Sequence, residues 1–178
     1  MSSPNILAIS GSTRITSVNN AILHHIQTTQ NITIYEGLTT LPFFNPDLTD
    51  PENLPVQVQH FLSLIENADG VIICTPEYVF SLPGVLKNAI EWCVASTVFQ
   101  DKPLAMIVAS LSGQKAFESL DLVMTTVGAR ATPGTKLLIS GAYSKLDKAT
   151  QTLDKHTITL LDSLMSSFRD LLAGRARP

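Results

Sequence analysis

The chain has 178 residues, of which 44% are hydrophobic and 15% charged, with a formal net charge of −3. This length and composition predict a single globular domain over residues 1–178 with a sizeable core. The lack of a basic cluster excludes nucleic acid as an expected partner, and no apolar run has the length of a membrane span. Because the N-terminus also lacks a signal-peptide pattern, we expect a cytoplasmic protein with no membrane partner.

A strand, a polar turn and a helix open the chain. Residues 5–10 form a nearly continuous apolar run, as in a strand buried on both faces, and residues 17–30 carry apolar side chains at helical spacing. The turn between them places Ser12, Thr13, Arg14, Thr16, Ser17 and Asn19 at a helix N-terminus. The first amides of a helix lack partners and favour an anion, which hydroxyl, amide and guanidinium groups also bind. The turn therefore predicts a cup for one phosphate group, although a plain polar loop with Ser17 as helix N-cap is the alternative.

The same turn lacks two other phosphate-binding patterns. It has no G-K-[ST] sequence, so it is not a P-loop for a triphosphate. It also has no G-x-G-x-x-G fingerprint, because threonines stand at positions 13 and 16. A cup filled by side chains suits a terminal monophosphate.

The rest of the chain alternates between strand and helix patterns. Further strands are expected over residues 31–36, 70–75 and 103–110 and within 128–139, and helices over 56–68, 85–96, 115–127 and 149–173. We expect Val94 to face inward, and Leu153 and Leu160 to lie on the buried face of the last helix. Residues 37–55 form a long loop with four prolines, either functional or a packed surface crossover, of which we prefer the second.

This alternation predicts the fold class α/β. We expect a flavodoxin-like three-layer sandwich, with a five-stranded parallel sheet in the order 2-1-3-4-5 and helices on both faces. In such sheets ligands bind at the carboxyl ends of the strands, between strands one and three. That rule brings residues 11–19, 76–81 and 110–113 around one crevice.

The middle segment of this crevice suits a flat ring. Residues 76–81 offer backbone amides, the Tyr78 ring and two apolar side chains, although a plain strand-to-helix connection is the alternative. Flavin mononucleotide (FMN) has such a ring and one terminal phosphate. Glu77 is the only acid in the crevice, and no catalytic triad can be assembled there, which favours a cofactor enzyme over a hydrolase.

Cysteines and histidines predict no metal site. Cys74 and Cys93 lack metal-ligand spacing and lie in apolar surroundings, as expected of buried reduced thiols. The four histidines fall in predicted helices without a ligand pattern, so we expect them on helix surfaces. These are His24, His25, His60 and His156.

Two motifs resemble a known family. G-S-x-R-x-x-S-x-N at residues 11–19 and T-P-E-Y-x-x-S-x-P-G-x-L-K-N-A-I-E-W at 75–92 look like those of the NADPH-dependent FMN reductases. The resemblance implies a flavodoxin-like fold and non-covalent FMN. It implies two-electron, ping-pong transfer from NADPH or NADH to a small-molecule acceptor: a quinone, an azo compound, a metal oxyanion or free flavin. It also implies a homodimer, or a tetramer, with residues 86–92 near the subunit contact, although Trp92 could equally be a core aromatic.

The resemblance carries over to particular residues. It implies that Ser12, Arg14, Ser17, Val18 and Asn19 hold the phosphate, that Pro76, Glu77, Tyr78 and Val79 line the ring, and that Ser110, Ser112 and Gly113 close the other side. Val79 stands where the family most often has asparagine, which removes a side-chain contact near the ring. Gln114 and Lys115 stand where a glycine pair is more usual, and could narrow the pocket or meet the phosphates of the nicotinamide nucleotide.

Three other functions stay open from the sequence. A flavodoxin-type electron carrier would bind FMN without a nicotinamide site, but such carriers tend to be more acidic than this chain. A nicotinamide-dependent Rossmann enzyme could use Glu36 to hold a ribose, but the glycine fingerprint is absent. A binding module that has lost the flavin is the third.

Overall fold

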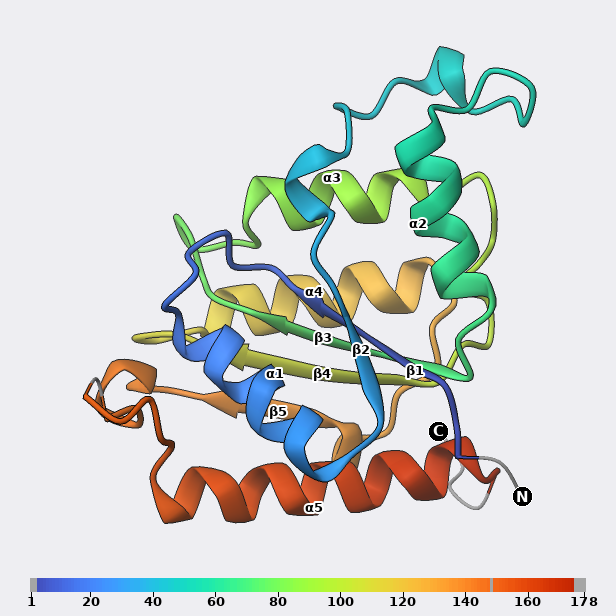
Figure 1. The fold of residues 1–178 in the computed structure, drawn as a ribbon. Helices are drawn as coiled ribbons and strands as arrows, with labels where there is room; N and C mark the ends of the chain where they lie inside the picture. Colours follow the sequence, from blue (N-terminus) through green and yellow to red (C-terminus); the bar gives the residue numbers. More distant parts are fainter. Residues whose placement is uncertain (1–2, 148, 175–178) are drawn as a thin grey trace.

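The computed structural model describes residues 3–147 and 149–174 and has three layers (Figure 1). Five parallel strands form the central sheet in the order β2-β1-β3-β4-β5. They are β1 (Ile6–Ser10), β2 (Ile32–Tyr35), β3 (Gly70–Thr75), β4 (Leu104–Ala109) and β5 (Lys136–Ile139). The fold class, the strand order and the flavodoxin-like architecture expected from the sequence are therefore confirmed.

Helices cover both faces of this sheet. They are α1 (Val18–Thr29), α2 (Val56–Glu66), α3 (Gly84–Trp92), α4 (Gln114–Thr126) and α5 (Lys155–Leu172). α1 and α5 pack on one face, and α2, α3 and α4 pack on the other (Figure 1). β3 and β4 are buried at every residue, which explains why the sequence shows them as continuous apolar runs.

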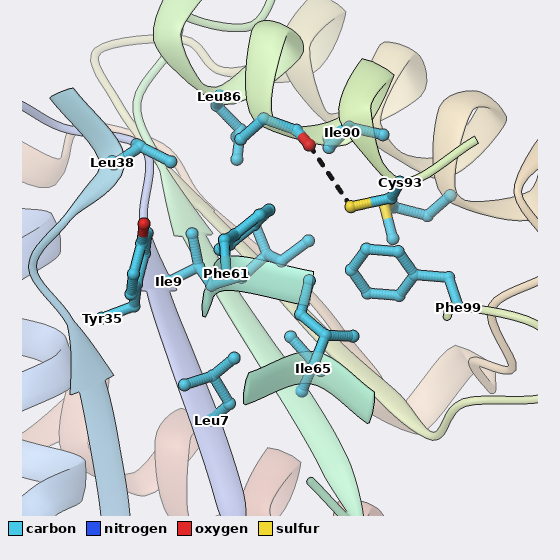
Figure 2. Packing of buried hydrophobic residues seen from close by; sticks show 14 of the residues in the cluster. Leu7, Ile9, Tyr35, Leu38, Phe61, Ile65, Leu86, Ile90, Cys93 and Phe99 are labelled. Atoms are coloured by element: carbon cyan, nitrogen blue, oxygen red, sulfur yellow. Dashed lines mark hydrogen bonds between the residues drawn. The ribbon is translucent and has the colours of Figure 1, made fainter. Parts of the chain in front are cut away.

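The core between the sheet and the layer of α2, α3 and α4 is shown in Figure 2. Leu7 and Ile9 of β1 point toward Phe61 and Ile65 of α2, and the Tyr35 ring lies 4.9 Å from the Phe61 ring. Burial of this kind supplies most of the driving force for folding, at about 25 cal/mol per Å² of apolar surface.

The last helix begins six residues later than expected. Asp154 is its N-cap and accepts a hydrogen bond from the Thr157 amide at 2.7 Å. Leu153 is buried as expected, but through a bridge to Leu146 that lies before the helix. The predicted buried face is wrong at one position, since Leu160 is only half-buried and its neighbour Leu161 is buried instead, whereas Leu164, Phe168 and Leu171, which the same helical spacing predicts, are buried.

α3 is shorter than expected, and Val94 does not face inward. The amides of Cys93 and Val94 donate to carbonyls three residues back, at 3.0 and 3.2 Å, which tightens and ends the helix. Val94 then points to solvent with 61% of its surface exposed.

The proline-rich segment 37–55 is a packed crossover, as preferred from the sequence. The Pro42 carbonyl accepts hydrogen bonds from Asn88 Nδ2 at 3.0 Å and Trp92 Nε1 at 2.9 Å. Asn88 Oδ1 accepts from the Phe44 amide at 2.7 Å, and the Phe44 ring meets Trp92 edge-on. Trp92 is therefore a core aromatic that anchors this segment to α3.

The fold creates a crevice where β1 and β3 end. The chain leaves β1 toward the α1 face and leaves β3 toward the α3 face, so the two connections separate at neighbouring strand ends (Figure 1). Gly11, just after β1, is packed so closely against β3 that an added Cβ would lie 2.7 Å from Thr75 Cβ.

We therefore expect Gly11→Ala to destabilise the fold by about 1–3 kcal/mol, the usual cost of overpacking a core. Gly84→Ala is the matched control, because a Cβ there meets nothing within 4 Å. Urea unfolding of both variants measures the difference, and equal stabilities would contradict the close packing at Gly11.

Candidate functional site

A cavity of about 370 Å³ lies at the carboxyl ends of β1, β3, β4 and β5. Its walls come from the four segments that follow these strands. The lining residues are Ser12, Arg14, Thr16, Ser17, Val18, Asn19, Pro76, Tyr78, Ala109, Ser110, Ala142, Tyr143, Leu146 and Gln151.

Eight of the twelve residues predicted for the site line this cavity, namely Ser12, Arg14, Ser17, Val18, Asn19, Pro76, Tyr78 and Ser110. The other four, Glu77, Val79, Ser112 and Gly113, are not among the lining residues. The structure thus brings together the predicted phosphate loop and parts of the two other segments.

The phosphate loop is held by hydrogen bonds within the chain. Ser17 is the N-cap of α1, and its side chain accepts from the Asn20 amide at 3.1 Å. Asn20 Nδ2 donates to the carbonyls of Arg14 and Ile15, both at 3.1 Å, and Asn20 Oδ1 accepts from Ser10 Oγ at 2.5 Å. Asn20 therefore shapes the loop, a role that sequence reasoning missed although an asparagine in the first helical turn could have indicated it.

Asn19 is more deeply engaged than expected. It is 3% exposed, and its Nδ2 donates to the Ala109 carbonyl at 3.2 Å. Its Oδ1 accepts from Cys74 Sγ at 3.4 Å. The side chain ties α1 to the ends of β3 and β4, so Asn19 positions the cavity wall as well as lining it.

Arg14 gives the cavity its charge. It is the only charged residue among the lining residues, its side chain is exposed, and the structure shows no ion pair for it within residues 3–147 and 149–174. The positive end of α1 lies against the same part of the cavity. A guanidinium, a helix N-terminus and several hydroxyls in one place form an anion site of the kind that binds phosphate.

Other lining residues of the same cavity are less polar. Pro76, Ala109 and Leu146 are buried, and Tyr78 is 45% exposed. A cationic anion site together with apolar and aromatic lining residues matches a molecule that carries a single phosphate and a flat ring. The residues present therefore fit FMN.

Glu77 links two of the segments around the cavity. Its Oε2 accepts hydrogen bonds from the amides of Lys115 at 2.9 Å and Ala116 at 3.0 Å, in the first turn of α4. Gly113, the N-cap of α4, has no side chain to do this. A carboxylate from a distant segment thus replaces the missing cap and interacts favourably with the helix dipole.

A wall that the sequence did not predict comes from the segment after β5. Residues 145–147 and 149–154 belong to a small hairpin, in which the Asp147 amide donates to Thr152 O and the Asp154 amide donates to Lys145 O, both at 2.9 Å. The hairpin and the turn before it bring Tyr143, Leu146 and Gln151 to the cavity. Residues 149–154 of this hairpin were predicted as the start of the last helix, and no pattern in the sequence indicated a hairpin.

Ser112 and Gly113 have other roles in the structure. The Ser112 carbonyl accepts from Ser140 Oγ at 2.8 Å, and Gly113 begins α4 with a φ of +85°, which favours glycine. Lys115 forms a 2.7 Å ion pair with Glu118, and Gln114 Nε2 donates to the same carboxylate at 3.1 Å.

Val79 and Phe80 form the tip of a two-residue hairpin that projects from the cavity rim. Tyr78 and Ser81 exchange two backbone hydrogen bonds of 3.0 Å, and the residues between them have φ values of 52° and 56°. The left-handed region costs a residue with a Cβ about 1–2 kcal/mol, and a β-branched valine there is a genuine outlier. The turn is therefore strained.

The cysteines and histidines have no place in the site. Burial raises the pKa of both Cys74 and Cys93 thiols far above the ordinary value, so both thiols stay protonated and unreactive. His24, His60 and His156 are exposed and His25 is half-buried on helices, as expected. Among the described residues, no three histidine, cysteine or carboxylate side chains gather as a metal site.

No helix in the described part of the chain is both long and apolar enough to cross a bilayer.

The strand order and the position of the cavity define a class of protein. A 2-1-3-4-5 parallel sheet with a phosphate-accepting loop after its first strand is the flavodoxin-like, FMN-binding architecture. Within this class the chain belongs to the NADPH-dependent FMN reductase family, whose model matches residues 4–144. It is an NAD(P)H-dependent flavin oxidoreductase, and its cofactors are FMN and NAD(P)H.

Known proteins similar to the chain agree with this assignment. An NADH:(hydroxy)cinnamate reductase subunit, CrdA, of Vibrio ruber is 32% identical over 174 residues, which cover 92% of this chain and 85% of that protein. A quinone reductase of Escherichia coli is 32% identical over 104 residues, 56% of this chain and 54% of that protein. The structure of FerB, a flavoenzyme NAD(P)H:(acceptor) oxidoreductase of Paracoccus denitrificans, superposes with a TM-score of 0.76 at 24% identity, covering 97% of this chain and 98% of that one.

The cap from Glu77 yields a test. Glu77→Ala removes the acceptor for two α4 amides, and we expect it to cost about 1–2 kcal/mol of stability, as loss of a helix cap does. Glu77→Gln keeps an acceptor oxygen and should retain most of that stability.

Urea unfolding measures both effects. Glu118→Ala is the control, because it removes an exposed carboxylate from the same helix without touching the cap. A Glu77→Ala variant as stable as the control would show that the two hydrogen bonds contribute nothing.

Proposed function

We propose that the cavity holds FMN with its phosphate against residues 12–19 and its ring beside Pro76 and Tyr78. The observation that supports this placement is the position of Arg14, the one charged group among the lining residues, at the N-terminus of α1. The lining residues are then cofactor-binding residues, and no side chain has to act as acid or base.

Bound FMN supplies the redox chemistry, by which two electrons pass from NAD(P)H to a small acceptor in a ping-pong cycle. Overall, NAD(P)H and one proton reduce a quinone to a quinol and leave NAD(P)⁺. Azo compounds, metal oxyanions and free flavin are further acceptors within this proposal. The chain's own residues bind the phosphate, orient the ring and cover part of it from water.

The strongest alternative is transfer of electrons to a partner protein. Its support is the name of the Vibrio ruber relative, which is called a subunit of an NADH:(hydroxy)cinnamate reductase. Such a chain would act as a flavodoxin-type carrier and would need no site for nicotinamide.

We further infer a single domain over residues 1–178, a cytoplasmic location and a homodimer that can pair into a tetramer. The family resemblance supports the assembly. The two buried thiols, Cys74 and Cys93, support a reducing compartment.

Reduction by NADPH separates the two functions. If the protein is a reductase, we expect NADPH, added without oxygen, to bleach the visible flavin absorbance of the holoprotein within seconds of mixing. A quinone added next should restore the absorbance. Flavin that stays oxidised with both NADPH and NADH would contradict the reductase and favour the carrier.

A substitution tests the phosphate site. Arg14→Ala should weaken FMN binding by roughly 1.5–3 kcal/mol, because a hydrogen bond to a charged group contributes that much. Arg14→Lys keeps the charge but loses the planar fork, so we expect an intermediate affinity. Flavin fluorescence during titration of the apoprotein measures both, and an unchanged affinity in Arg14→Ala would exclude Arg14 from the phosphate site.

A further inference from the structure

We propose that the hairpin between β5 and α5 makes the cavity select FMN against flavin adenine dinucleotide (FAD), and that Gln151 of this hairpin is the selecting residue. Neither sequence motif includes the hairpin, and the match to the family model ends at residue 144. This inference rests on the proposed placement of the FMN phosphate and adds a specificity-determining residue to the same site.

Gln151 stands on the boundary between two hollows. One is the cavity proposed for FMN, and the other is a groove of about 440 Å³ between α1 and the segment where the hairpin leads into α5. Among the described residues, Ser17 and Gln151 are the two that line both. Ser17 is the N-cap of α1, so the boundary lies where the phosphate loop meets the hairpin.

FMN and FAD differ at this end of the molecule. FMN ends in its phosphate, whereas in FAD one oxygen of the same phosphate carries an adenosine monophosphate (AMP) group, which has to leave the phosphate loop. The groove beyond the boundary has the composition of a site for such a group, because apolar side chains and imidazoles line it together. They are Ile15, Ala21, His24, His25, Leu153 and Ile158. An AMP group that extends past Ser17 into this groove meets Gln151.

The glutamine side chain favours the monophosphate in two ways. Its amide NH₂ can donate a hydrogen bond to a terminal phosphate oxygen, which FMN has and which FAD uses for the link to AMP. Its bulk also stands on the boundary that the AMP group has to cross. An attraction for one ligand and an obstacle to the other together give specificity.

The backbone of Gln151 supports a functional role for its side chain. Its φ is +56°, in the left-handed region that glycine adopts without cost and other residues rarely adopt. The residue is exposed, so burial of the side chain does not compensate for this conformation. Backbone strain of this kind is typical of positions that serve binding.

The rest of the hairpin holds Gln151 in this conformation. The Asp147 carboxylate accepts hydrogen bonds from the amides of Ala149 at 2.8 Å and Thr150 at 3.1 Å. The Thr150 and Thr152 hydroxyls, on either side of Gln151, lie 2.7 Å apart and share a hydrogen bond. The position of the glutamine side chain is therefore set by its neighbours before any flavin binds.

Gln151→Gly tests the proposal, because glycine suits the backbone and removes the side chain. Calorimetric titration of the apoprotein with FMN and with FAD gives both dissociation constants. We expect FMN to bind roughly three- to tenfold more weakly, as the loss of one hydrogen bond entails. FAD should bind at least as well as it does to the wild type, so that the preference for FMN falls by this factor or more. The melting temperature should not fall, since the strain is relieved.

Two further variants separate selection from effects on the backbone. Thr97→Gly is the matched control, because Thr97 is exposed and has a φ of +54°. It lies in the connection from α3 to the amino end of β4, whereas the cavity lies at the carboxyl ends of the strands. This variant should leave both flavin affinities unchanged. Gln151→Asn keeps an amide in a residue that tolerates positive φ, and should restore part of the preference for FMN.

The contrary results are distinct. If the wild type binds FAD as tightly as FMN, Gln151 selects nothing. The same follows if Gln151→Gly weakens both flavins equally or changes neither, while Arg14→Ala still weakens FMN. If Arg14→Ala also leaves the affinity for FMN unchanged, the proposed phosphate site itself is refuted.

Discussion

The candidate site depends on a concentration of unpaired positive charge between the end of β1 and the start of α1. The first amides of α1 and the guanidinium of Arg14 face one end of the cavity, where no acid lies among the lining residues. Such a site is unfavourable unless water or an anion satisfies its donors. The rest of the fold adds apolar and aromatic side chains to the lining of the same cavity, which is the basis for proposing that it holds a molecule with one phosphate and one ring.

Side-chain hydrogen bonds hold several walls of the cavity in place. Asn19 ties α1 to β3 and β4, and Asn20 holds the phosphate loop in shape. Glu77 joins the segment after β3 to α4, and the small hairpin before α5 forms the remaining wall. The contacts of Asn20 and of the hairpin are local, but those of Asn19 and Glu77 join segments 38 to 90 residues apart in the chain, so these parts of the cavity can form only once the strands have come together.

The sequence predicted the sheet well because its signals are strong and local. Buried parallel strands appear as apolar runs, and the phosphate loop combines several residue types that share one chemistry. The hairpin at residues 145–147 and 149–154 was missed because its register depends on a bridge between Leu146 and Leu153. The cap from Glu77 was missed because its partners lie 38 and 39 residues away, and no local pattern marks such a pair.

The comparison of FMN with riboflavin tests the account most directly, because the two molecules differ only by the phosphate. Titration of the wild-type apoprotein with each, followed by flavin fluorescence, gives both dissociation constants. The account predicts that FMN binds at least about 100-fold more tightly, as several hydrogen bonds to a charged group require. Affinities that agree to within about threefold would contradict it, since the loop after β1 would then contribute almost nothing to binding.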